Sequence, residues 1–124
     1  MNLSMYEDIG SRKADKLNKN TKRNMIARIW KGQTKIEHLE AYTDFMKMRA
    51  IPDYRETNGF VKLSFLRRTD DEFAYFKLIT YWENLEVIQN FAGTDFEKAK
   101  YYPEDENYLI DFPEMVTHYE VFAE

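Results

Sequence analysis

The stretch FAYFKLITYWENLEVIQNFAG, residues 73–93, decides the predicted fold of this chain. Its first half is rich in β-branched and aromatic side chains, which indicates a strand that ends at Trp82. Asn84 can then cap a helix whose apolar residues recur at helical spacing, and Gly93 ends that helix because glycine tolerates a left-handed backbone. A strand that leads directly into a helix in this way places the indole of Trp82 at the mouth of any cavity between sheet and helix.

The segments on either side of this stretch predict one further helix and three further strands. A short apolar strand is followed by a helix that Thr34 caps and Pro52 ends, because proline lacks the backbone N–H that a helix needs. After Gly93, residues 96–100 can form one or two more helical turns. The predicted strands are residues 26–30, 60–68, 73–82 and 115–122.

The order strand, helix, strand, strand, helix, strand favours an α+β, ferredoxin-like βαββαβ fold with a four-stranded antiparallel sheet and both helices on one face. We expect Leu78 and Trp82 to point toward the helices. The opposite face of the same strand then carries Phe73, Tyr75, Lys77, Ile79 and Tyr81. A second copy of the chain is the simplest cover for such an apolar face, so the sequence predicts a homodimer.

Length and charge predict one globular domain preceded by a basic extension. The chain has 124 residues, of which 44% are hydrophobic and 16% aromatic, enough for one core that is rich in rings. Residues 1–24 hold 6 of the 18 basic and 3 of the 22 acidic residues, which leaves 12 basic and 19 acidic residues in the remainder. We interpret residues 1–24 as a flexible basic extension and residues 25–124 as the domain.

The composition argues against several classes of function. Binding to nucleic acid needs clustered Lys and Arg, which the acidic domain lacks. The absence of cysteine removes thiolate chemistry and favours the cytoplasm, and no apolar run is long enough to span a membrane. No GxGxxG or P-loop pattern is present, and two histidines are too few for a His-rich metal cluster. The acidic residues 104–106 indicate a solvated loop rather than a calcium site.

Five segments carry a resemblance to a known family: MIARIWKG (25–32), IPDYRETNGF (51–60), LITYWENLEVIQNFAG (78–93), AKYYPEDENYLIDF (99–112) and HYEV (118–121). The domain resembles the antibiotic biosynthesis monooxygenase-like (ABM) domains of the dimeric α/β-barrel superfamily. The resemblance implies a homodimer whose two sheets form a barrel, with a ligand cleft between sheet and helices in each subunit. Relatives include cofactor-free oxygenases of aromatic polyketides, haem-degrading enzymes and small proteins without a known activity.

The resemblance also implies candidate site residues. Trp82 matches a tryptophan on the third strand of both the oxygenases and the haem degraders. Leu78 stands four residues earlier on that strand, where a substrate-binding asparagine of the oxygenases would be expected. The segment that supplies the haem-ligating histidine in the degraders has no histidine here, and Tyr102 could ligate ferric iron there only as a phenolate. The resemblance therefore implies a protein without a cofactor, with haem as a minor alternative.

An oxygenase without a cofactor needs a substrate that itself reduces oxygen after losing a proton, such as an electron-rich phenol or anthrone. The protein then holds a flat ring, removes a proton, stabilises the oxyanion and excludes water. We predict that Trp82 stacks on the ring, that Arg28 stabilises the anion, and that His118, with an ordinary pKa of about 6.5, acts as the base. Tyr54 and Tyr102 are predicted hydrogen-bond donors at the rim.

Each of these residues also has a structural interpretation. Trp82 could be a core aromatic residue, and Arg28 could pair with Glu120 across the sheet. His118 could lie at the dimer interface, and Tyr102 with its neighbouring tyrosine could anchor a loop. Two further functions remain open at this point: a dimeric small-molecule-binding or stress-responsive protein without turnover, and haem binding or degradation.

Overall fold

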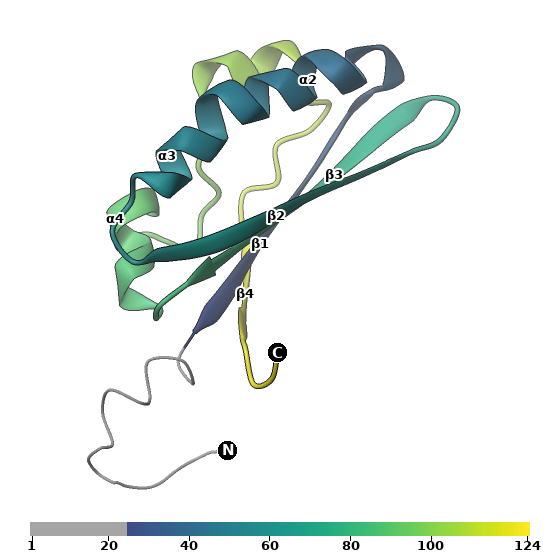
Figure 1. The fold of residues 1–124 in the computed structure, drawn as a ribbon. Helices are drawn as coiled ribbons and strands as arrows, with labels where there is room; N and C mark the ends of the chain where they lie inside the picture. Colours follow the sequence, from purple (N-terminus) through teal and green to yellow (C-terminus); the bar gives the residue numbers. More distant parts are fainter. Residues whose placement is uncertain (1–24) are drawn as a thin grey trace, which may run out of the picture.

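The computed structural model describes residues 25–124, so the predicted basic extension at residues 1–24 lies outside the described residues. A four-stranded antiparallel sheet with the order β2-β3-β1-β4 forms the centre of the molecule, and the helices lie on one of its faces (Figure 1). This is the predicted ferredoxin-like α+β arrangement. The strands are β1 (Ile26–Lys35), β2 (Phe60–Thr69), β3 (Phe73–Trp82) and β4 (Thr117–Glu120).

Three helical segments cover the sheet. The first follows β1 without a break and the second follows β3, whereas the third lies in the long segment before β4. Within residues 25–124, no helix is long and apolar enough to cross a membrane. The helices are η1 (Ile36–His38), α2 (Leu39–Phe45), η2 (Met46–Ala50) and α3 (Ile51–Arg55), then η3 (Glu86–Ile88) and α4 (Gln89–Ala92), and finally η4 (Pro103–Asn107).

The strand, the helix cap and the helix end predicted for residues 73–93 are present, but the indole of Trp82 is fully buried and does not lie at the mouth of a cavity. Along β3 buried and more exposed side chains alternate, and Leu78 and Trp82 are on the buried side that faces the helices. The side-chain oxygen of Asn84 accepts the backbone N–H of Val87 at 3.0 Å and so caps the second helical segment. Gly93 ends that segment with a φ of 84°.

The first helical segment differs from its prediction at both ends. Thr34 does not cap a helix, because it is fully buried in β1 and pairs with Ala74 of β3. Pro52 does not end the helix either, because the chain remains helical to Arg55. A proline inside a helix loses one hydrogen bond and crowds the preceding turn. The wide π-helical turn η2, directly before α3, relieves that crowding.

The segment between α4 and β4 was the least predictable part of the domain. Residues 96–100 do not form a helix. Residues 96–97 lie in a turn, in which the backbone N–H of Lys98 donates to the backbone oxygen of Asp95 at 3.1 Å, and Lys98 makes an isolated bridge with Met115. The helix forms after them, at η4, because Pro103 occupies its first turn, where a missing N–H costs nothing. The last strand, β4, is also shorter than the predicted 115–122.

Two glycines with positive φ allow a matched test of packing at the junction between β2 and the second helical segment. Gly59 has a φ of 93°, and a Cβ there would lie 2.4 Å from the Cβ of Val87. Gly93 has a φ of 84°, and a Cβ there would have no atom within 4 Å. We expect Gly93→Ala to lower the free energy of unfolding by about 1–3 kcal/mol from backbone strain alone, and Gly59→Ala to lower it by about 1–3 kcal/mol more, because its Cβ also overpacks against Val87.

Urea unfolding of the two variants measures this difference directly. Equal losses in Gly59→Ala and Gly93→Ala would show that the contact with Val87 adds nothing to the backbone strain.

Candidate functional site

A small cavity lies between the sheet and the helices. Its volume is about 20 Å³, which is enough for about one water molecule and far too small for an aromatic ring. Its walls combine a buried cation, several phenols and one carboxylate. They are formed by Arg28, Trp30, Tyr42, Phe45, Met46, Ala50, Tyr54, Leu78, Lys100, Tyr101, Tyr102 and Asp105.

Four of the six predicted site residues meet at this cavity. Arg28 comes from β1, Leu78 from β3, Tyr54 from α3 and Tyr102 from the segment before η4. These residues are distant in sequence, and the βαββαβ topology brings them together on the helix side of the sheet. The other two predicted residues, both assigned catalytic roles, are not among the residues that line the cavity.

Arg28 is the most unusual residue of the site. Only 2% of its surface is exposed, and its guanidinium donates to the backbone oxygens of Lys98 at 3.0 Å and Phe96 at 3.4 Å. Its Nε has no hydrogen-bond partner among the described residues. The register places Arg28 opposite His118 and Glu120 opposite Ile26, so a cross-strand pair of Arg28 with Glu120 does not form. Burial lowers the pKa of Arg28, which is the expected response of a cation that lacks a neutralising carboxylate.

Two tyrosines line the same cavity as this cation. Burial raises the pKa of Tyr54 to about 12, so its phenol stays protonated at neutral pH and can donate a hydrogen bond. The hydroxyl of Tyr102 donates to Asp53 Oδ2 at 2.5 Å, and Lys100 Nζ donates to the same oxygen at 3.0 Å. Burial alone would raise the pKa of Asp53, but these two hydrogen bonds outweigh it and hold the pKa below its usual value. The ionised Asp53 therefore holds the hydroxyl of Tyr102 in place at the wall of the cavity.

Trp82 is enclosed in the core. None of its surface is exposed, and its indole N–H donates to Thr80 Oγ1 at 2.9 Å. Its ring packs against Phe60, Phe91 and Tyr54, with centroid distances of 5.5, 5.9 and 6.2 Å. Trp82 does not line the cavity, and it is joined to residues that do through Tyr54 and Phe91. Stacking of the indole on a substrate stays a prediction.

His118 lies on β4 directly opposite Arg28, and its ring packs edge-on against Phe96 at 5.7 Å. Its Nε2 is buried and has no hydrogen-bond partner among the described residues. Burial, and then the positive charge of Arg28, lower the pKa of His118 from 6.5 to about 4. The imidazole is therefore neutral at pH 7. It can accept a proton, although a base is most effective when its pKa is near the working pH.

The lowered pKa of His118 predicts a pH dependence of stability. The unfolded chain binds a proton at His118 near pH 6.5 and the folded chain only near pH 4, so the contribution of His118 is complete above pH 6.5 and is lost as the pH falls toward 4. We expect His118→Gln to flatten the decrease in melting temperature over this range. His38→Gln, in η1, is the control that keeps the wild-type slope, and an unchanged slope in His118→Gln would contradict the assignment.

Asp105 is a buried residue that the sequence analysis missed. Only 3% of its surface is exposed, so the interpretation of residues 104–106 as a solvated loop is wrong at this position. Its two carboxylate oxygens accept the hydroxyl of Tyr42 at 2.8 Å and the backbone N–H of Tyr102 at 2.7 Å. Burial raises its pKa. A carboxylate two residues after Pro103 is the third residue of η4, and this spacing of a capping box is the signal that could have revealed it.

The cavity does not fit haem. Its volume of about 20 Å³ cannot hold a porphyrin. Tyr102 would have to ligate iron as a phenolate, but burial and its hydrogen bond to Asp53 raise its pKa and keep the phenol protonated. In residues 25–124 there is also no cluster of three or more His, Cys, Asp or Glu side chains that could hold a metal ion.

A larger groove adjoins the cavity at the β2 edge of the sheet. Its volume is about 230 Å³, and it shares Met46 and Leu78 with the small cavity. An apolar cavity of about 150 Å³ is enough to bind benzene, so a ring fits the groove by volume. Met46 and Leu78 are the only residues that line both the groove and the small cavity. The groove is lined by Thr43, Met46, Lys47, Ile51, Phe65, Leu66, Arg67, Phe76 and Leu78.

Comparison with known proteins addresses the fold. No protein-family model matches the chain, and no curated protein matches it significantly. A conserved protein from Methanosarcina mazei Go1 is similar in structure, with 14% identity, a TM-score of 0.61 and coverage of 81% of this chain and 95% of that chain. A proposed antibiotic biosynthesis monooxygenase from Bacillus cereus has 16% identity, a TM-score of 0.56 and coverage of 82% and 96%.

A third solved structure agrees with the first two. A proposed antibiotic biosynthesis monooxygenase from Nitrosomonas europaea is 16% identical, with a TM-score of 0.57 and coverage of 79% of this chain and 90% of that chain. The similarity spans nearly the whole of each neighbour, and at these identities it concerns the fold. The chain therefore has the fold of the antibiotic biosynthesis monooxygenase-like domains, as its sequence resemblance predicted.

Proposed function

We propose that the protein is a monooxygenase-like enzyme that oxidises a small aromatic, polyketide-like substrate between the sheet and the helices without a cofactor. The observation that carries this proposal is Arg28. A cation that is 98% buried and has no salt bridge to a carboxylate among the described residues is costly to the fold. An anionic substrate oxygen beside it would recover that cost.

The groove and the cavity together provide a place for such a substrate. The flat body lies in the groove of about 230 Å³, and its oxygen points past Met46 and Leu78 toward Arg28. Met46 is unbranched and adaptable, so its movement can join the two spaces. Tyr54 donates a hydrogen bond from the far wall, whereas the hydroxyl of Tyr102 donates to Asp53 and only helps to shape that wall. Trp82 supports Tyr54 from behind.

The reaction requires only a substrate that can itself reduce O₂ after it loses a proton. Deprotonation of an anthrone gives an oxyanion that Arg28 and Tyr54 stabilise. The carbanion then transfers electrons to O₂ and forms a peroxide at carbon, and loss of water leaves the quinone. Anthrone and O₂ thus give anthraquinone and water, and no external reductant is required. His118, which is neutral at pH 7 and lies opposite Arg28, is the proposed base.

The test is oxygen uptake by the purified protein with anthrone as substrate. We expect Arg28→Met to lower kcat/KM by about 100-fold, the usual effect of removing an oxyanion donor. The melting temperature should change little, because an apolar residue of similar length often replaces a buried charge without loss. Arg55→Met, on exposed α3 surface, is the control that keeps full activity. Full turnover in Arg28→Met would refute the assigned role.

A second candidate function is the binding of a small aromatic ligand without turnover. It is favoured by the small volume of the cavity and by the lowered pKa of His118. Naphthol, titrated calorimetrically, separates the two possibilities. Binding that Arg28→Met weakens, in a protein that consumes no oxygen with anthrone, would establish the non-enzymatic function.

The resemblance also implies a homodimer, and the outer sheet face provides a surface for it. One half of this face is apolar, with Ile29, Ile79, Tyr81 and Tyr119 in register across β4, β1 and β3. We propose that a second copy of the chain covers this face. Light scattering is expected to give the mass of a dimer, and Tyr119→Asp is expected to shift it to a monomer. A monomer mass for the wild-type protein at micromolar concentration would contradict the proposal.

A further inference from the structure

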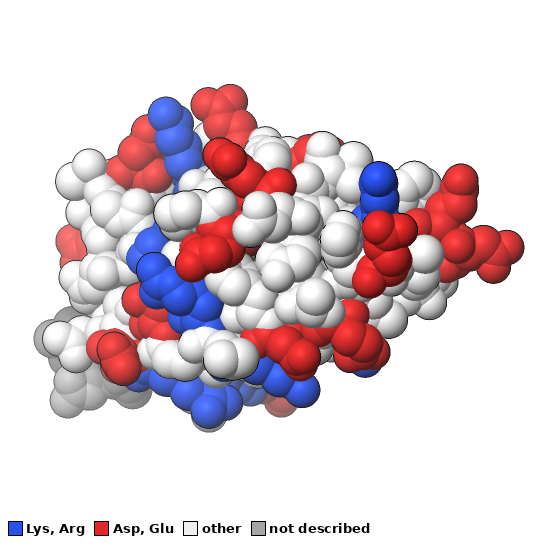
Figure 2. All heavy atoms as spheres, turned by 90° about the horizontal axis from the view of Figure 1, so that it is seen from above, with Lys and Arg blue, Asp and Glu red and all other residues white. Residues whose placement is uncertain are grey.

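The groove at the β2 edge of the sheet has a positively charged rim. Its lining is apolar except for Thr43, Lys47 and Arg67, and it includes no carboxylate. The domain as a whole has the opposite charge balance: residues 25–124 hold 12 basic and 19 acidic residues, and acidic side chains lie across the helix-side face (Figure 2). Two cations in a lining without a carboxylate favour the approach of an anionic group to this groove.

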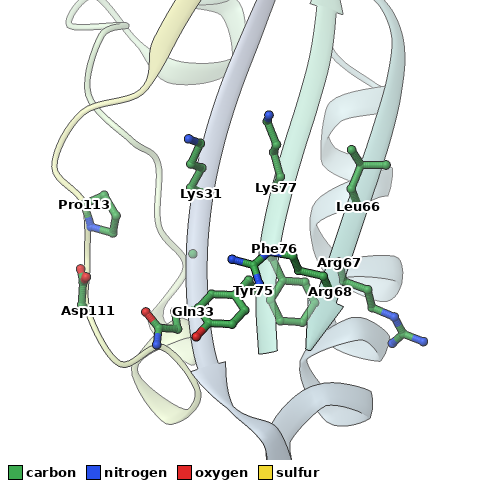
Figure 3. A pocket seen from close by; sticks show the side chains of 11 residues that line it. Lys31, Gln33, Leu66, Arg67, Arg68, Tyr75, Phe76, Lys77, Asp111 and Pro113 are labelled. Atoms are coloured by element: carbon green, nitrogen blue, oxygen red, sulfur yellow. The ribbon is translucent and has the colours of Figure 1, made fainter. Parts of the chain in front are cut away.

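Arg67 reaches the rim from β2, on the helix side of the sheet. Consecutive residues of a strand point to opposite faces, and Figure 3 shows Arg67 and Arg68 extending to opposite sides of β2. Arg68 is thus on the outer face, which is assigned above to a second copy of the chain. Nη1 of Arg67 donates to Thr43 Oγ1 at 2.7 Å and to Glu40 Oε1 at 3.3 Å. Arg67 is therefore held across the rim, between the edge strand and α2.

The guanidinium of Arg67 has more donors than these contacts use. An arginine has five N–H groups, and the contacts to Thr43 and Glu40 both use Nη1. The side chain of Glu40 is 72% exposed, so its ion pair with Arg67 is weak and screened by salt. A carboxylate that approaches from the groove can accept two parallel hydrogen bonds from the fork of Arg67.

Lys47 provides the second cation, from the helix side of the rim. It follows Thr43 by four residues, about one helical turn, and both residues line the groove. The side chain of Lys47 is exposed and has no salt bridge within residues 25–124. A lysine ammonium is a compact charge on a flexible stem, so Lys47 can move toward an anion that Arg67 holds.

The order of the strands places this rim at the outer end of the proposed substrate position. β3 lies between β2 and β1, so Leu78 of β3 separates the groove beside Arg67 from the cavity beside Arg28. A flat ligand in the groove then has a cation at each end, with Arg28 beyond Leu78 and with Arg67 and Lys47 at the solvent side. Apolar side chains such as Phe65 line the space between them.

We propose that Lys47 and Arg67 bind an anionic group, such as a carboxylate, at the end of the substrate that is opposite to the oxygen beside Arg28. This inference rests on the proposed function, because it concerns the same groove. It narrows the substrate to a flat phenol or anthrone that carries an anionic substituent at its far end. The two charged ends also set the direction of binding, which the apolar walls alone do not fix.

Calorimetric titration with three naphthalene derivatives tests the proposal without any need for turnover. The hydroxyl and the carboxylate are at opposite ends of the ring system in 6-hydroxy-2-naphthoate, the extended isomer, and are adjacent in 3-hydroxy-2-naphthoate; 2-naphthol has no carboxylate. We expect the extended isomer to bind about tenfold more tightly than either of the others at low salt, and to lose most of this advantage at high salt. Equal affinity of the two naphthoates would overturn the proposal, because the distance between hydroxyl and carboxylate would then not be recognised.

Variants locate the anionic group. Arg67→Met is expected to weaken binding of the extended isomer about tenfold and Lys47→Met about threefold, because arginine donates paired hydrogen bonds and lysine a single exposed charge. Neither variant should change the affinity for 2-naphthol. Arg55→Met, on the exposed surface of α3 outside the groove, is the control that should leave both affinities unchanged. Unchanged affinity for the extended isomer in both rim variants would overturn the assignment.

Glu40 allows a change in the opposite direction. Its carboxylate competes with the ligand for Arg67. Glu40→Gln is therefore expected to tighten binding of the extended isomer about threefold and to leave 2-naphthol unchanged. Weaker binding of the extended isomer in Glu40→Gln would contradict the position of the anionic group beside Arg67.

The outcomes separate this inference from the proposed function. If 2-naphthol binds and Arg28→Met weakens its binding, but the extended isomer has no advantage, the rim site is wrong and the role of Arg28 stands. If Arg67→Met weakens binding of the extended isomer and Arg28→Met does not, the rim site is confirmed and the proposed role of Arg28 fails. Absence of binding of all three compounds would overturn both.

Discussion

Trp82→Ala is expected to lower the free energy of unfolding by about 3–5 kcal/mol, as is usual when a large buried aromatic side chain is removed from a core. The indole has no exposed surface, and it contacts Phe60, Tyr54 and Phe91 at once. Its removal also leaves Thr80 without the hydrogen bond from the indole N–H. Such a loss is a large part of the stability of about 5–15 kcal/mol that is typical of a folded domain.

Urea unfolding followed by circular dichroism measures the effect, and Trp82→Phe is the matched variant. Phenylalanine keeps most of the apolar contact and should lose clearly less stability. Binding of naphthol to the two variants distinguishes the two roles of Trp82. A small loss of stability in Trp82→Ala together with loss of naphthol binding would place the indole at the ligand surface and would contradict its role in the core.

Asp105→Ala is expected to lower the free energy of unfolding by about 2–4 kcal/mol, because it removes two buried hydrogen bonds and leaves a buried phenol unpaired. Asp105 joins α2, through the hydroxyl of Tyr42, to the backbone of Tyr102 at the start of η4. Both partners are themselves buried, so water does not replace the lost contacts. The same change should loosen the wall of the small cavity, to which all three residues belong.

A double-mutant cycle with Tyr42→Phe isolates the interaction. Phenylalanine removes only the hydroxyl that donates to Asp105 Oδ1. Because the two groups are in contact, the combined variant should lose about 1–2 kcal/mol less than the sum of the single variants. Additive losses would show that the 2.8 Å contact contributes nothing measurable to stability.

The candidate site could be predicted in part. Residues that are placed by the local pattern of a strand could be predicted, and residues that are placed by contacts between distant segments could not. Leu78 follows from the alternation of β3, and Arg28 from its place within an apolar strand. Whether Arg28 has a counter-ion depends on the register with β4, which sets His118 and not Glu120 opposite to it. The capping-box spacing after Pro103 could indicate that Asp105 caps a helix, but not that it is buried, because its burial depends on Tyr42, 63 positions away in sequence.

The amino-acid sequence by itself determined the order of strands and helices, the side of β3 that faces the helices, the cap at Asn84 and the end at Gly93, because these depend on periodicity and local backbone preference. The tertiary structure alone decided that the space between sheet and helices is nearly filled, that Trp82 is enclosed, and that Arg67 of β2 contacts Thr43 of α2. Volumes, burial and cross-strand partners arise from contacts between residues far apart in the chain, and no local pattern of residues encodes those distances.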